Sequence, residues 1–403
     1  MSKINELIKE MCPNGVKKYT VKDICLVTRG RVISKMELQE NIGEYPVYSS
    51  QTLNNGVFGK INTYDFEGQY VQWTTDGANA GSIFYRNGKF SVTNVCGLLK
   101  VKDEYFNVIN TNYLSYALTV ESKKYVNYAT SNPKLMSNVM KKITVLIPPI
   151  EIQEEIVKIL DKFVELEAEL EAELEARESQ YEFWSGKIFE SQMSGETKHI
   201  TDIALVKARV GWQRLTKSEY LNAGDYYLIT GTDFTLDGEI DFNNCVYVTK
   251  ERYEMDKNIQ VHENDILITK DGTLGKIAYL ENEPDKLTTL NSGVFRIKII
   301  DDNVLPRYIY HYFNSKIFKD FIAKVKTGST IPHLTQEKLV GLNIPIPNIE
   351  GQKKIISILD KFSDLTRSLS VGLPAEIKLR KKQYEYYRNK LLNFKVQSIY
   401  EEN

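Results

Sequence analysis

The sequence predicts an α+β protein with two similar domains of mixed α/β structure and curved sheets. Two long helices that form an antiparallel coiled coil separate and link these domains. The first observation behind this prediction is a duplicated segment, IPPIEIQEEIVKILDKF at 147–163 and IPNIEGQKKIISILDKF at 346–362, with 11 of 17 positions identical. Proline at the start followed by apolar spacings of three and four is typical of a strand end that enters an amphipathic helix. Two copies so far apart indicate a repeated domain plus helix and exclude a solenoid.

The second observation is a framework that recurs ahead of each copy. We expect the first domain to cover residues 1–146, where short aromatic-rich strands such as YPVYSS and GVFGKI are broken by glycine and asparagine. The second domain, residues 196–345, repeats its frame: DGANAGSIFY is echoed by DGTLGKIAY, and ATSNPKL by GSTIPHL. The stretches between these frames are almost unrelated. One fold is therefore expected twice, with two different variable surfaces.

Residues 147–195 and 346–403 are the predicted helical regions. The first contains Glu-Leu-Glu-Ala three times, a strongly helix-forming composition. Residues 151–178 hold 11 acidic and 3 basic residues, whereas 350–394 hold 10 basic and 5 acidic residues. Equivalent apolar seams of opposite charge favour pairing, and the domain between them favours an antiparallel pair. Gly372 and Pro374 predict a kink in the second region.

The aromatic residues near the helix ends can be interpreted in two ways. We expect them mainly in the core of the helix pair, and the alternative is a docking surface for a partner protein. They are Tyr181, Phe183, Trp184, Tyr384, Tyr386 and Tyr387.

Composition limits the function classes. No run of 18 apolar residues occurs, so no membrane span is expected, and the start of the chain lacks the apolar core of a signal peptide, which favours a cytoplasmic location. Four scattered cysteines without CxxC spacing argue for reduced thiols and against zinc. No phosphate-binding loop, HExxH or GxSxG motif is present, so we expect no catalytic residue, metal or cofactor on this chain.

Charge is segregated along the chain. The net charge is −1, and residues 151–178 carry −8, so the remainder carries +7. Positive globular parts suit a polyanionic partner. Solvated charge on a helix face explains the acidic run equally well.

Over essentially its whole length the chain resembles the specificity subunits of type I restriction-modification systems, with a repeat array like that of the type IC branch. The duplicated segments, the KKQYEYYRNKLL ending and the Glu-Leu-Glu-Ala array carry the resemblance. It implies a non-catalytic subunit whose two target-recognition domains each read one half of a bipartite, asymmetric site in double-stranded DNA. It further implies two methyltransferase subunits and two restriction subunits as partners, with S-adenosylmethionine, ATP and magnesium on those partners.

Candidate DNA-binding residues come from polar, glycine-flanked stretches that we expect between strands. Glutamine and asparagine suit adenine edges, arginine suits guanine or phosphate, and lysine suits phosphate. In the first domain the candidates are Gln72, Trp73, Thr74, Thr75, Asn79, Arg86, Lys123, Lys124 and Lys134. In the second they are Thr230, Thr232, Thr269, Lys270, Thr273, Lys276, Lys324, Lys326 and His333.

Structural roles compete with these assignments. Ordinary turn chemistry is the alternative for the polar residues, the core for Trp73, and a structural histidine for His333. For Asp271 the Asp-Gly turn, repeated at Asp76-Gly77, is the favoured interpretation.

Two rival functions remain open at this point. One is a scaffold of a DNA-modification complex without DNA contact, and the other is a single-chain restriction and methylation enzyme. The array itself predicts a measurable property, because four more helical residues add about 6 Å against about 3.4 Å of rise per base pair. Changing its length should change the permitted spacer and leave the half-sites unchanged, unless the array is simple helix filler.

Overall fold

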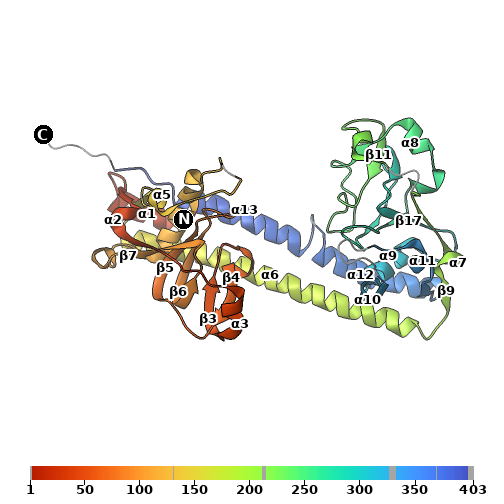
Figure 1. Ribbon diagram of the computed structural model, residues 1–403, viewed down its shortest axis with the longest axis horizontal. Coiled ribbons are helices and arrows are strands. Elements are labelled where there is room, and N and C mark those ends of the chain that lie inside the picture. The colour runs from red at the N-terminus through yellow and green to blue at the C-terminus, as the bar shows by residue number, and fades with distance from the viewer. Residues whose placement is uncertain (1, 130, 211–214, 326–332, 369, 398–403) are drawn as a thin grey trace. The chain divides into compact units, whose positions relative to one another are not determined.

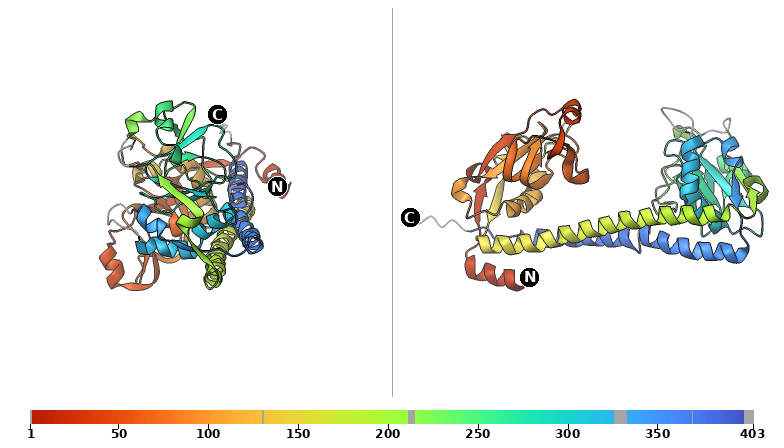
Figure 2. Two further views of the ribbon diagram at one scale, coloured as in Figure 1. Left: turned by 90° about the vertical axis from the view of Figure 1, so that its right-hand side faces the viewer. Right: turned by 90° about the horizontal axis from the view of Figure 1, so that it is seen from below.

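The computed structural model describes residues 2–129, 131–210, 215–325, 333–368 and 370–397. The chain forms two compact units, Met1–Glu167 with Arg380–Asn403, and Ala168–Leu379. Helix α6 (Ile150–Gln192) runs without a break from the first unit into the second, and α13 (Leu373–Leu391) runs from the second into the first (Figures 1 and 2). The mixture of sheets and long helices confirms the predicted fold class.

The first unit is built on a six-stranded sheet in the order β2-β7-β5-β6-β3-β4. Only β3 and β6 are parallel neighbours, and the other pairs are antiparallel. The strands are β2 (Cys25–Arg29), β3 (Ile42–Tyr48), β4 (Val57–Ile61), β5 (Phe66–Thr74), β6 (Ile83–Val92) and β7 (Cys96–Val101).

A pair of glycines lets the β5–β6 ribbon of this sheet curl. Gly68 and Gly88 face each other across the two strands, at φ 110° and 101°. Backbone in this left-handed half of the map is readily available only to glycine. Close to these glycines, the phenyl ring of Phe66 lies 5.7 Å from the Tyr70 ring and stacks 5.9 Å from the Phe90 ring.

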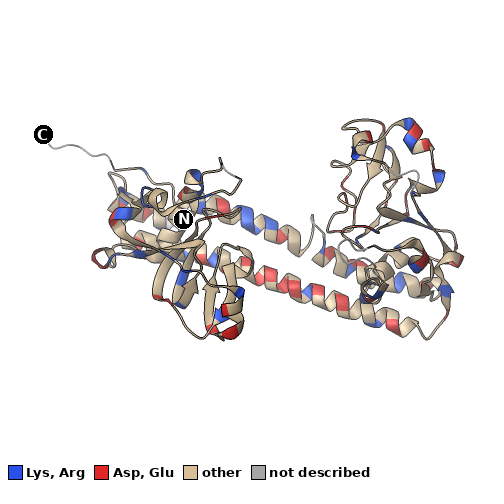
Figure 3. Ribbon diagram, viewed as in Figure 1, with Lys and Arg blue, Asp and Glu red and all other residues tan. Residues whose placement is uncertain are grey.

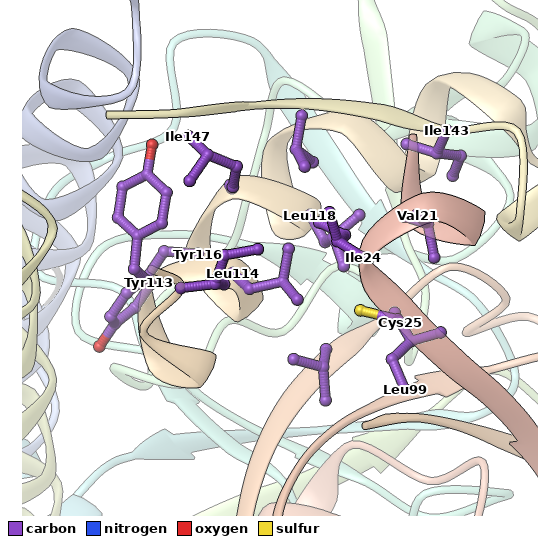
Figure 4. Packing of buried hydrophobic residues seen from close by; sticks show 14 of the residues in the cluster. Val21, Ile24, Cys25, Leu99, Tyr113, Leu114, Tyr116, Leu118, Ile143 and Ile147 are labelled. Carbon is purple, nitrogen blue, oxygen red and sulfur yellow. The ribbon is translucent and has the colours of Figure 1, made fainter. Parts of the chain in front are cut away.

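The core of the first unit lies between this sheet and α4 (Thr111–Glu121) (Figure 4). Leu114 and Leu118 of α4 are fully buried with Leu99 of β7, and Tyr113 donates from its hydroxyl to the carbonyl of Leu146 at 2.8 Å. Leu146 belongs to β8 (Thr144–Ile147), which pairs with β1 (Lys17–Thr20). The unit is completed by α1 (Ser2–Met11), α2 (Val21–Ile24), α3 (Lys35–Glu40) and α5 (Ser137–Met140).

The second unit repeats this plan with two smaller sheets. One has the order β10-β17-β14-β15 and the other β12-β11-β16-β13, while β18 pairs with β9 as β8 does with β1. The strands are β9 (Thr197–His199), β10 (Ala204–Ala208), β11 (Tyr226–Ile229), β12 (Val246–Tyr247), β13 (Gln260–Val261), β14 (Ile266–Thr269), β15 (Ile277–Tyr279), β16 (Leu287–Leu290), β17 (Val294–Ile299) and β18 (Asn343–Pro345). Its helices before the final pair are α7 (Ile200–Ile203), α8 (Lys250–Glu254), α9 (Pro306–Asn314), α10 (Lys316–Val325) and α11 (Gln336–Val340).

The duplicated segment holds each unit to its helix through one buried glutamine. Gln153 donates to the carbonyls of Val108 and Pro148 at 2.8 and 2.7 Å, and accepts from the backbone N–H of Asn110 at 2.9 Å. Gln352 makes the same three bonds, to the carbonyls of Asn303 and Pro347 and from the N–H of Leu305, each at 2.8 Å. We call this arrangement the glutamine clasp.

Helices pair inside each unit. In the first, Phe163 of α6 stacks on Tyr387 of α13 at 5.4 Å, and Glu167 forms an ion pair with Lys381 at 3.4 Å. The partner's number falls as that of α6 rises, so the pair is antiparallel, as predicted. In the second unit Tyr181 of α6 contacts Phe362 of α12 (Ile349–Thr366) with 6.4 Å between ring centroids. Acidic residues line the middle of α6, and basic residues are prominent on α13 (Figure 3).

The predicted kink is a complete break between α12 and α13. Gly372 adopts φ 88°, and a Cβ atom there would lie 2.3 Å from the carbonyl oxygen of Asp364. Pro374 follows as the second residue of α13, where it needs no hydrogen-bond donor.

The aromatic residues at the helix ends divide between the two interpretations. Tyr181 is buried, and Tyr384 and Tyr387 are partly buried, as expected for helix-pair core. For the remaining three the core expectation is wrong, because the exposed fractions are 54% for Phe183, 51% for Trp184 and 59% for Tyr386.

Candidate nucleic-acid interface

Four polar loops of the first unit contact one another: residues 49–56, 75–82, 93–95, and 127–129 with 131–134. The N–H of Thr93 donates to the carbonyl of Tyr48 at 2.9 Å, and its hydroxyl bonds to that of Ser49 at 3.1 Å. Asn79 donates to the carbonyl of Ser50 at 3.0 Å, and the N–H of Gly77 to that of Pro133 at 3.0 Å. We call this set the first loop cluster.

A carboxylate with two basic neighbours lies in the first loop cluster. Asp76 is 3.6 Å from the guanidinium of Arg29 and 4.0 Å from the ammonium of Lys134, and accepts a hydrogen bond from the hydroxyl of Thr75. Arg29 also donates to Thr75 at 3.0 Å and to the carbonyl of Asn94. Both cations are half-exposed, so they are accessible to a phosphate group.

The second unit forms an equivalent second loop cluster from residues 230–233, 270–276, 291–293 and His333. The N–H of Asn291 donates to the carbonyl of Ile229 at 2.9 Å, as Thr93 does to Tyr48. The N–H of Leu334 donates to the carbonyl of Lys270 at 2.9 Å, as Leu135 does to Thr75 at 2.8 Å.

Asp271 occupies the position of Asp76 in this second cluster. It precedes Gly272 in the predicted turn, with φ 71° at the glycine. Its carboxylate also lies 2.6 Å from Nδ1 of His333, a partner that the turn interpretation did not include. Each cluster thus joins a carboxylate to a basic side chain from the loop before the last strand.

Most of the predicted lysines and loop residues are at the surface. The following are exposed or half-buried in the two clusters: Asn79, Lys134, Thr230, Thr232, Lys270, Thr273, Lys276 and His333. Lys123 and Lys124 are exposed on the turn 122–125, which contacts the first cluster through the hydroxyl of Ser122, 2.7 Å from the carbonyl of Gly81. Lys324 is exposed in α10, and Lys326 lies outside the described residues.

The location expected for six candidates was wrong. They are buried, five of them within strands and one directly after a strand: Gln72, Trp73, Thr74, Thr75, Arg86 and Thr269. Five of them have hydrogen-bond partners for their side chains inside the fold, such as the carbonyl of Leu135, which accepts from the indole of Trp73 at 2.9 Å, whereas the buried hydroxyl of Thr74 has no hydrogen-bond partner among the described residues. A side chain without exposed surface cannot reach a base edge, so these residues do not enter the proposed interface.

Two parts of the first loop cluster were not predicted from the sequence. Arg29 ends a strand whose residues read as ordinary framework. Residues 49–56, SSQTLNNG, follow β3, and their Asn-Asn-Gly ending is a turn signal that could have identified the loop.

The part of the chain that the structure describes shows neither a metal-binding cluster nor a membrane-spanning helix. It contains no group of three or more His, Cys, Asp and Glu residues placed to hold a metal ion. None of its helices combines the length and apolar character needed to cross a membrane.

Comparison with known proteins agrees with this architecture. Residues 13–176 and 195–379 each match the family described as the type I restriction modification DNA specificity domain. A type I specificity subunit of Mycoplasma pneumoniae, S.MpnORF507P, is 33% identical over 94% of this chain and 98% of its own length. The specificity subunit of the M. pneumoniae type I restriction enzyme MpnII is 48% identical over 148 residues, which are 37% of this chain and 44% of that protein.

Two solved structures share the fold. The specificity subunit of a type I restriction-modification system from M. genitalium has a TM-score of 0.55 at 16% identity, covering 94% of this chain and 96% of its own. A chain from a structure on the assembly and conformational transition of the type I system has a TM-score of 0.60 at 13% identity, covering 94% and 98%. The duplicated family match and the near full-length relative together show that this chain belongs to the type I restriction-modification DNA specificity family and is a DNA specificity subunit.

Proposed function

We propose that each unit reads one half of a bipartite, asymmetric site in double-stranded DNA through its loop cluster. The observation that carries this proposal is the equivalence of the two clusters. The same backbone bonds position both sets of loops, while the side chains on the loops differ. Equivalent scaffolds with different polar side chains suit the reading of two different short sequences, because base edges specify and phosphate contacts only position.

The chain acts as a non-catalytic member of a larger assembly in this proposal. Two methyltransferase subunits and two restriction subunits supply the chemistry, and S-adenosylmethionine, ATP and magnesium bind to them. The exposed aromatic residues of α6 and α13 (Phe183, Trp184 and Tyr386) are candidates for the methyltransferase contact, because such side chains are enriched at protein interfaces. In this scheme the helical array sets the spacing between the half-sites.

Methylome sequencing tests the recognition role. Cells that express this chain with its methyltransferase subunit are compared with cells that lack the chain. A split methylated motif that depends on the chain is expected, and its sequence gives both half-sites. An assembled complex without such a motif would refute recognition and favour the scaffold alternative.

A charge variant on the turn 122–125, which contacts the first loop cluster, tests this surface more locally. Lys123→Gln should weaken DNA binding by the purified complex and reduce the slope of log K against log salt by about 1. The matched control is Lys89→Gln, an equally simple loss of an exposed lysine at the β5–β6 bend, where Lys89 pairs with Glu67 at 3.9 Å. Equal slopes for the two variants would argue against the first cluster as the DNA-binding surface.

A further inference from the structure

The tip of the first loop cluster has an unusual surface. Residues Thr52 to Asn55 are exposed, and the Leu53 side chain has an exposed fraction of 83%, among the highest of the large apolar residues. The segment follows β3, directly beyond the residues that contact Thr93 and Asn79. An exposed leucine flanked by threonine and asparagine offers both apolar and amide contacts from one short segment.

The backbone of this tip is held in a costly conformation. Asn54 has φ 49° and ψ 44°, Asn55 has φ 49° and ψ 30°, and Gly56 has φ 77°. Three consecutive residues are thus left-handed, a conformation that asparagine and glycine adopt more readily than other residues, but usually as single residues. Such strain persists only where the surroundings fix the conformation.

The buried side chain of Arg86 fixes the conformation of this loop. Its guanidinium donates to the side-chain oxygen of Asn55 at 3.0 Å, to the carbonyl of Asn55 at 2.9 Å, and to the side-chain oxygen of Gln72 at 2.7 Å. It also lies over the Tyr48 ring, 3.6 Å from its centroid. A Cβ atom on Gly56 would come within 3.0 Å of the same guanidinium. The arginine therefore binds the loop from inside and leaves its outer residues exposed.

We infer that Thr52–Asn55 is the base-reading loop of the first unit, with Arg86 as its positioning residue. Asn54 pairs with the N6 and N7 atoms of an adenine in the major groove, and Leu53 lies against a thymine methyl group. These are the contacts for which amide and apolar side chains are suited. The inference rests on the proposed function, and names the residues that would determine one of its two half-sites.

The equivalent loop of the second unit is built differently. There the carboxylate of Asp233 is buried and accepts from the N–H and the hydroxyl of Thr230, at 2.6 and 3.0 Å. Among the described residues no arginine holds that loop in this way, so the two units present different chemistry at the same place. The inference accordingly concerns one half-site alone.

The test uses the purified complex with its methyltransferase subunit. Methyl transfer is measured on duplexes that carry the methylated motif, and on duplexes with each base pair of each half-site replaced in turn. Asn54→Gly removes the amide and keeps the left-handed backbone available, and Leu53→Ala removes the apolar contact. Ile42→Ala is the matched control, an exposed (79%) residue at the opposite end of β3, about 20 Å along the strand.

Both loop variants should lose roughly 10- to 100-fold in discrimination at one or two A·T pairs of a single half-site. The other half-site and the Ile42→Ala variant should keep full discrimination. Arg86→Lys should reduce discrimination at the same base pairs as Asn54→Gly, because it releases the loop without removing any of the loop's own side chains. Relaxation at different positions, or in both half-sites, would assign Arg86 a general structural role and refute its positioning role.

The inference can fail while the proposed function stands. A wild-type complex that methylates a split motif, combined with loop variants that discriminate normally in both halves, would refute the reading loop alone. A wild-type complex with no sequence preference would refute the proposed function first.

Discussion

Replacing one clasp glutamine should destabilise one unit and spare the other. Gln153→Leu removes three hydrogen bonds of 2.7 to 2.9 Å and leaves the N–H of Asn110 and the carbonyls of Val108 and Pro148 without this partner. Net contributions near 1 kcal/mol for each bond predict a loss of about 3 kcal/mol from the free energy of unfolding. Leucine has a similar volume, so packing changes contribute little to this figure.

Hydrogen exchange monitored by mass spectrometry suits the measurement, because a chain of two units need not unfold in a single step. Gln153→Leu should accelerate exchange in α4 and β8, and Gln352→Leu should do so in α9 and β18. At pH values where a buried glutamic acid is protonated, the conservative variant Gln153→Glu keeps an acceptor for Asn110 and one of the two donated bonds, so it should lie between wild type and Gln153→Leu. A loss below about 1 kcal/mol in both leucine variants, or equal effects on the two units, would refute the reasoning.

Three further predictions concern the helices and the surface. Gly372→Ala should lower the melting temperature of the chain, because its Cβ would lie 2.3 Å from the carbonyl of Asp364 at a φ that alanine adopts poorly. The control is Gly195→Ala, where the nearest atom to the added Cβ is 3.3 Å away. Equal melting temperatures for the two variants would contradict the steric argument. Hydrogen bonding from Lys198, at 2.8 Å, holds the pKa of the Asp301 carboxyl below its usual value. The ion pair therefore stabilises the fold above the ordinary pKa of aspartate, and this stabilisation is lost as the pH falls through the lowered pKa. Lys198→Met should lower the free energy of unfolding at neutral pH and leave it unchanged in acid, which unfolding measurements at a series of pH values can check. Insertion of one Glu-Leu-Glu-Ala unit should lengthen the spacer of the methylated motif by about two base pairs, from about 6 Å of added helix and about 3.4 Å per pair, and a motif with an altered half-site would contradict this.

Most of the architecture could be predicted from signals that involve only a few neighbouring residues. The duplicated segment, its apolar seam and the Gly372–Pro374 pair act over a few residues, and the structure shows the helices and the break that they predict. The location predicted for Gln72 and Trp73 was wrong for a different reason. Their partners are Arg86 on the next strand and the carbonyl of Leu135, 62 residues beyond Trp73. Polar residues buried by such distant partners read in the sequence like exposed turn residues.

The candidate interface was predictable in part for the same reason. Asn79, Lys134, Thr230 and His333 were found because glycine and proline mark their loops. Arg29 was not, because its place beside Asp76 depends on how β2, β5 and the loop before β8 come together. The residues at 53–55 carry a turn signal, but their conformation is imposed by Arg86 from 31 residues away.

The glutamine clasp binds only main-chain atoms on the unit that it holds. Carbonyl and N–H groups are present whatever side chains the recognition loops carry, so the joint is indifferent to the sequence being read. A coding segment exchanged between relatives at the duplicated stretch would bring in a new half-site and keep the clasp, while Asp161 would have to exchange Asn112 and Tyr116 for partners such as Arg307 and His311, which bind the equivalent Asp360. Diversification of target sequence is thereby uncoupled from assembly, and new combinations of half-sites can arise by recombination alone.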